Sequence, residues 1–146
     1  MQEIKKRIAI GGISTECSTY SSLHQNEKDF ECIQNNELLD LIEFPFKKYN
    51  IDLIILEMII NPSICKPAID AALASGLPVW LGLSCGDESE EGDLFAFENS
   101  RMKFSETLTT INTNFDAVLL MHSETKNITK GLQEIKSKWN GHLGAY

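Results

Sequence analysis

The chain has 146 residues, with 13 lysines and arginines against 21 aspartates and glutamates, and a formal net charge of −8. This length suits a single domain, since domains most often contain about 100–150 residues. The acidic balance gives no electrostatic footprint for nucleic acid or for an anionic membrane surface. No apolar run approaches the roughly 20 residues that span a bilayer, and the apolar run Ile8–Ile13 is too short for the core of a signal peptide. We therefore expect a cytoplasmic protein that binds neither nucleic acid nor membranes.

The cysteines show no metal-binding or redox spacing. Cys17, Cys32, Cys65 and Cys85 form no CxxC pair, so neither a zinc ribbon nor a thioredoxin-type site is indicated. Disulfides are unusual in the cytoplasm. We expect Cys17, Cys32 and Cys65 to be buried thiols that pack as small hydrophobic side chains.

Five short apolar runs predict β-strands. They are Ile8–Ile13, Ile51–Leu56, Pro78–Leu83, Ala117–Met121 and Leu143–Tyr146. The second, third and fourth runs are apolar at nearly every position instead of alternating with polar residues. Continuous apolarity indicates burial on both faces, which is typical of a parallel sheet covered by helices.

The segments between these strands have helical patterns or helix boundaries. We predict helices over 36–44, from Asn61 to Gly76, over 102–114 and over 125–138. Because Pro67 is costly deep inside a helix, the regular part of the second helix is expected to begin near Pro67. The acidic stretch Gly86–Asp93 is interpreted as a solvated loop. The order β-α-β-α-β-α-β-α-β predicts one α/β domain over residues 1–146, with a mainly parallel sheet and right-handed crossovers.

Ligands of parallel α/β folds bind beyond the carboxyl ends of the strands. Four of the five predicted strands end in polar or ligating residues, and the last strand does not. These residues are Ser14–Cys17, Glu57, Ser84 with Cys85, and His122–Glu124. Polar side chains gathered at one sheet edge predict a binding site, although such residues also occur at strand ends without a function.

Three of these side chains are able to bind a ligand or take part in catalysis. Glu57 can bind a substrate ammonium by a charge-assisted hydrogen bond, or it can be a helix cap or a solvated carboxylate. His122 can be a metal ligand or general base, because its ordinary pKa lies near 6.5, or a hydrogen-bonded histidine with no function. Cys85 can coordinate a soft metal as a thiolate, or simply pack in the core. Zinc accepts all three ligand types, but no sequence spacing imposes its geometry.

Several blocks in about two-thirds of the chain carry a resemblance to a known family. They are IDLIILEM (51–58), AIDAALASGLPVWLGLSC (68–85), GDLFAF (92–97), FDAVLLMHSE (115–124) and WNGHLGAY (139–146). In their order and spacing these blocks resemble the homocysteine S-methyltransferase family. The resemblance implies a TIM (β/α)8 barrel, of which residues 51–146 would form a segment and the chain about half. It also implies that zinc holds the homocysteine thiolate for attack on a methyl donor.

The resemblance also implies roles for individual residues. Glu57 matches the glutamate that holds the substrate amine, and His122 stands in the place of one zinc cysteine. The other two zinc cysteines of the family belong to a GGCC-type motif, which this sequence does not reach. We expect His122 as catalytic residue and metal ligand, Cys85 as metal ligand, and Glu57, Ser84 and Cys85 as substrate-binding residues. Zinc is the expected cofactor, and a small-molecule thiol and a methyl donor are the expected partners.

The first fifty residues show a different resemblance. The blocks RIAIGGISTECSTYSSLHQNEKDF (7–30) and ELLDLIEFPFKKY (37–49) resemble the start of the microcystinase C-type metallopeptidase family. A fusion, a truncated gene product and a diverged part of the barrel all explain this difference. An alternative function is therefore metal-dependent hydrolysis, in which Glu16 or Glu57 activates a metal-bound water. A further alternative is a non-catalytic module that binds a small molecule.

The length of the chain predicts self-association. A complete (β/α)8 barrel needs about 200–250 residues, so half of one would leave exposed sheet edges and an open apolar face. We expect either a two-fold homodimer or rearrangement into an open five-stranded sheet, and favour the dimer. Light scattering measures the mass, and a monomer at micromolar concentration would contradict the dimer.

Overall fold

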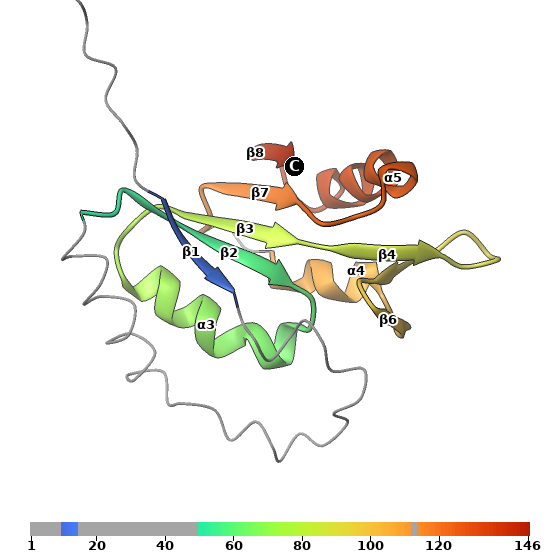
Figure 1. Cartoon of the computed structure of the whole chain (residues 1–146), viewed down its shortest axis with the longest axis horizontal. Coiled ribbons are helices and arrows are strands. Elements are labelled where there is room, and N and C mark those ends of the chain that lie inside the picture. The colour runs from blue at the N-terminus through green and yellow to red at the C-terminus, as the bar shows by residue number, and fades with distance from the viewer. Residues whose placement is uncertain (1–9, 15–49, 112–113) are drawn as a thin grey trace, which may run out of the picture.

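The computed structural model describes residues 10–14, 50–111 and 114–146 (Figure 1). Five of its strands form one sheet in which every pair of neighbours is parallel. In their spatial order, these strands are β1 (Ile10–Ser14), β2 (Leu53–Ile59), β3 (Val79–Leu83), β7 (Ala117–Leu120) and β8 (His142–Ala145). The prediction of an α/β fold with a mainly parallel sheet is confirmed. The helix predicted over 36–44 lies outside the described residues.

The two longer helices, α3 (Pro62–Ala74) and α5 (Thr125–Lys136), cover one face of this sheet. The core on that face joins Ile69 and Ala72 of α3 with Ile135 of α5, and it takes alternate side chains from the three central strands. A smaller cluster on the opposite face contains no residue of a described helix. It consists of Leu53, Ile55 and Met121, with Met58, Trp80 and Leu119 packed against it. We call these the helix-covered face and the second face. No helix among the described residues is both long and apolar enough to cross a membrane.

Helix α3 begins earlier than predicted. It starts at Pro62 and contains Pro67, so the expectation of a regular helix only from Pro67 onward is wrong. The first turn is already closed before Pro67, since the Cys65 N–H donates to the Asn61 carbonyl at 3.0 Å. Cys65 is fully buried, as predicted, and its burial helps to hold this turn on the sheet. The helix ends as expected near Gly76, which has a left-handed φ of 74°.

A second, antiparallel sheet interrupts the predicted β-α alternation between β3 and β7. It contains β4 (Cys85–Glu88), β5 (Leu94–Ala96) and β6 (Asn99–Lys103), in the order β4-β5-β6. The short helix α4 (Phe104–Thr107) and the 3-10 helix η2 (Leu108–Thr110) follow it, so the helix predicted over 102–114 is present in a shorter form, only partly as α-helix. The interpretation of Gly86–Asp93 as a solvated loop is confirmed only in part: most of the stretch is exposed, but it contributes most of β4 as well as the turn into β5.

Long-range contacts hold this small sheet in place. Leu94 and Phe104 are both buried in the core on the helix-covered face, which anchors the sheet to the rest of the structure. Lys130 of α5 bonds the Glu88 carboxylate and the Gly92 carbonyl, one at the end of β4 and one in the turn. Lys130 lies far from the hairpin in sequence, so the local pattern of the acidic stretch did not indicate a strand.

Candidate functional site

The candidate site lies where the carboxyl ends of the parallel strands meet. Glu57 lies within β2, which extends to Ile59, two residues beyond its position. Ser84 directly follows β3, and His122 lies two residues beyond β7. The structure therefore brings these three predicted residues to one edge of the sheet, which we call the carboxyl edge.

Glu57 belongs to the second face, on which Leu53 and Ile55 precede it in alternation along β2. Its carboxylate reaches over the neighbouring strand, because a Cβ placed on Gly12 would lie 3.1 Å from Glu57 Oε1. The side chain is half-buried, and no basic side chain in the described part of the chain pairs with it. A ligand cation is therefore able to serve as the counter-charge of this carboxylate.

Met121 lies at the centre of the carboxyl edge. Its side chain is fully buried, and its sulfur accepts the Met58 backbone N–H at 3.4 Å and the Tyr146 hydroxyl at 3.7 Å. It also fills the space above Gly82, where any Cβ would overlap with Met121 Cε. One thioether thus connects β2, β3 and the residue that follows β8.

Tyr146 is a site residue that sequence reasoning missed. It directly follows β8, and its backbone N–H donates to the Leu120 carbonyl at 3.2 Å. Its ring meets that of His122 edge to face, with ring centroids 6.1 Å apart. The expectation that the last strand end brings no polar group is therefore wrong. The signal that could have found it is the phenol itself, a polar group at the end of an otherwise apolar run.

Two residues of the carboxyl edge have a left-handed backbone. Met58 has a φ of 55° and His122 a φ of 49°. Side-chain-bearing residues rarely adopt this region, and such strained positions gather at functional sites. At Met58 the strain coincides with a register shift between β2 and β3, and Met58 donates its N–H to Met121. The backbone of this edge is thus irregular at both β2 and β7.

Ser84 carries a buried hydroxyl without a partner. The residue is fully buried, and among the described residues Ser84 Oγ is the buried side-chain atom with no hydrogen-bond partner. Its neighbours Leu83 and Cys85 both join the core on the helix-covered face, so extended backbone directs Ser84 toward the second face. A buried polar atom left unpaired is costly and calls for an explanation.

Cys85 lies on the other side of the sheet from the candidate site. A Cβ placed on Gly131 of α5 would lie 3.3 Å from Cys85 Sγ. Burial raises the pKa of the Cys85 thiol, against the hydrogen bond with Ser123 that lowers it. Without a bound metal, the thiol therefore stays protonated at neutral pH.

The described residues do not bring the predicted zinc ligands together. Cys85 packs against α5, whereas His122 packs against Tyr146 on the second face. Within residues 10–14, 50–111 and 114–146, no three histidine, cysteine, aspartate or glutamate side chains are placed to hold a metal ion together. We therefore assign no chemical step to zinc.

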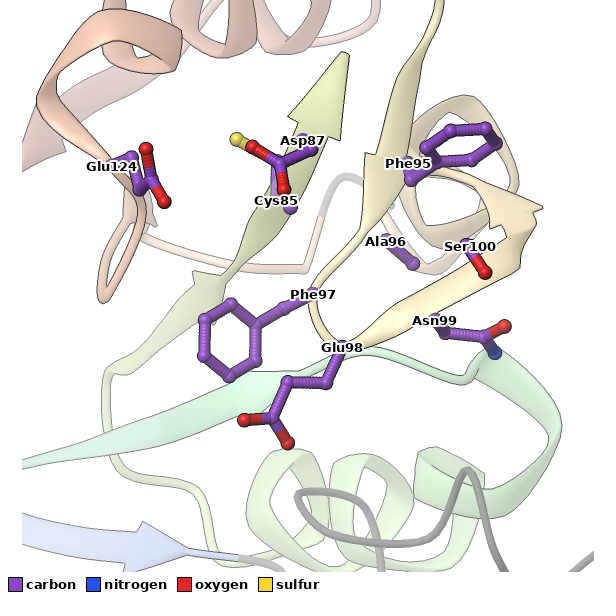
Figure 2. A pocket seen from close by; sticks show the side chains of 10 residues that line it. Cys85, Asp87, Phe95, Ala96, Phe97, Glu98, Asn99, Ser100 and Glu124 are labelled. Atoms are coloured by element: carbon purple, nitrogen blue, oxygen red, sulfur yellow. The ribbon is translucent and has the colours of Figure 1, made fainter. Parts of the chain in front are cut away.

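A pocket of about 350 Å³ opens beside the antiparallel sheet (Figure 2). Phe97 and Glu98, in the turn between β5 and β6, line one side, and Glu124 lies across from Cys85 and Asp87. Lys126 pairs with both Asp87 and Glu124 at 3.0 Å and neutralises part of their charge. Of these lining residues, only Cys85 was among the predicted site residues, because the hairpin that forms the pocket was not predicted.

Comparison with known proteins adds no family assignment. No protein-family model matches the chain, and the comparison with curated proteins finds no significant match. Function is therefore inferred from the fold and from the side chains of the carboxyl edge.

Proposed function

We propose that the chain is a homocysteine S-methyltransferase-like protein that binds a homocysteine-type amino acid at its carboxyl edge. The Glu57 carboxylate is the observation that carries this proposal, because it is half-buried and has no basic partner among the described residues. A ligand ammonium would supply the missing cation through a charge-assisted hydrogen bond. Gly12 leaves room for this arrangement, since any larger residue there would press on the carboxylate.

The strand order supports the same proposal. In a (β/α)8 barrel, consecutive parallel strands lie side by side, and the helices cover only the outer face. The order β1-β2-β3-β7-β8 and the placement of α3 and α5 have this form (Figure 1). On this proposal the second face corresponds to the interior of a barrel, and the carboxyl edge corresponds to its mouth, where barrel enzymes hold their substrates.

The surroundings of Glu57 suit a ligand with an apolar, sulfur-bearing chain. Met58 and Met121 lie beside it on the second face, and polarizable thioethers adapt to irregular ligand shapes. The unpaired Ser84 hydroxyl offers a further hydrogen bond in this direction. The described residues thus support the proposed binding of the ligand, and we assign no residue to the methyl-transfer step.

Calorimetric titration with L-homocysteine tests the proposal. We expect Glu57→Gln to weaken binding at least about tenfold, because it removes the charge but keeps the shape of the side chain. Glu90→Gln is the matched control, since Glu90 is exposed in the turn between β4 and β5. Circular dichroism of both variants confirms that each remains folded.

The titration is repeated with one equivalent of zinc and with His122→Ala. Zinc-dependent binding that this variant loses would add a metal role for His122. Absence of homocysteine binding under both conditions would refute the proposed function. Metal-dependent peptide cleavage that homocysteine does not affect would instead favour a hydrolase.

A further inference from the structure

We infer that Tyr146 and Glu57 form a clamp for the two charged groups of an α-amino acid, in which the Tyr146 hydroxyl donates to the ligand carboxylate. This inference rests on the proposed function and makes it more specific. Glu57 alone would select an amine, whereas the clamp would select an amine and a carboxylate carried by the same carbon atom.

Among the described residues, the Tyr146 hydroxyl has only a weak hydrogen-bond partner. It lies 3.7 Å from the Met121 sulfur, and a thioether is a poor hydrogen-bond acceptor. A ligand carboxylate is a much stronger acceptor, so the hydroxyl forms a stronger hydrogen bond when the carboxylate replaces the Met121 sulfur as its partner. Met121 would keep its contact with the Met58 N–H and its packing over Gly82.

The hydroxyl is also kept in its donor form. A phenol is protonated at neutral pH, so the Tyr146 hydroxyl is able to donate a hydrogen bond to a ligand carboxylate. Contacts bring the two residues to the same place, because the Tyr146 hydroxyl and the backbone N–H of Met58, the residue after Glu57, both bond the Met121 sulfur.

Two contacts place Tyr146, which is 62% exposed and so is accessible to a ligand. Its backbone N–H donates to Leu120 at the end of β7, and its ring meets His122 edge to face at 6.1 Å. The ring is therefore held beside the carboxyl edge without use of its hydroxyl. Removing the hydroxyl should leave these two contacts in place.

A pair of ligands that differ only in the carboxylate tests the clamp. L-Homocysteine and 3-aminopropane-1-thiol carry the same amine and thiol, but the second compound lacks the carboxylate. We expect Tyr146→Phe to weaken homocysteine binding about tenfold and to leave 3-aminopropane-1-thiol binding unchanged. Ser137→Ala is the matched control, because it removes an exposed hydroxyl that bonds Glu134 within α5.

The outcomes separate this inference from the proposed function. Equal weakening of both ligands, or unchanged homocysteine binding in Tyr146→Phe, would overturn the clamp. If Glu57→Gln still weakens homocysteine binding in that case, the proposed function stands without the clamp. If the unaltered protein binds neither ligand, both fail.

Discussion

Phe104→Ala is expected to lower the free energy of unfolding by about 3–5 kcal/mol, a loss in the range found for large aromatic side chains in protein cores. Phe104 begins α4 and is fully buried in the core on the helix-covered face. With Leu94 it anchors the small antiparallel sheet to the parallel one. Truncation of the Phe104 ring therefore leaves a cavity where the antiparallel sheet meets the core of the parallel sheet. It also removes buried apolar surface.

Urea denaturation followed by circular dichroism measures this loss, and thermal denaturation should show a midpoint lower by roughly 10 °C. Phe95→Ala is the matched control, since Phe95 lies in β5 of the same sheet but is only half-buried. We expect its cost to be less than half that of Phe104→Ala. Equal costs for the two variants would mean that Phe104 does not anchor the antiparallel sheet.

The parallel sheet could be predicted because its signal is local. The runs Ile51–Leu56, Pro78–Leu83 and Ala117–Met121 are apolar at nearly every position, and each contributes a strand with both faces covered at least in part. The ends of the strands were predicted less exactly. β2 runs on through Glu57 to Ile59, where a left-handed Met58 and a register shift replace regular pairing.

The antiparallel sheet could not be predicted because its signal is not local. β5 has only three residues, and β4 ends in the exposed acidic residues Asp87 and Glu88. The strands are held by Phe104, which directly follows β6 and is buried in the core, and by Lys130 of the distant helix α5. Strand propensity within a short window carries no information on the core that receives Phe104 or on Lys130.

Strand alternation places the predicted site residues on two different faces of the sheet. Ser84 and Cys85 are consecutive in extended chain, so their side chains point to opposite faces and cannot line one site. This alternation could be inferred from the sequence, and it places the Cys85 thiol away from Glu57 and His122. The places of Met121 and Tyr146 depend instead on which strands pair, since both residues join segments far apart in the chain.

Gly82→Ala is expected to destabilise the protein by about 3 kcal/mol, at the upper end of the usual cost of overpacking. A Cβ at this position would overlap with Met121 Cε and would lie 2.7 Å from the Leu56 carbonyl oxygen. Gly82 lies in β3, between β2 and β7, so neither neighbouring strand is free to move away. Gly144→Ala in β8 is the matched control, because a Cβ there meets only the tip of Leu119 at 3.0 Å.

A double variant identifies the group that resists the added methyl. If Met121 does, Gly82→Ala combined with Met121→Ala should cost about 1 kcal/mol or more less than the sum of the two single variants. Strict additivity in urea denaturation would mean that the Leu56 carbonyl carries the whole strain.

Gly82→Ala by itself also displaces the Met121 thioether, which the Tyr146 hydroxyl contacts. We therefore expect Gly82→Ala to weaken homocysteine binding, whereas Gly144→Ala should leave binding unchanged. Unchanged binding in Gly82→Ala would show that the position of Met121 does not control the carboxyl edge.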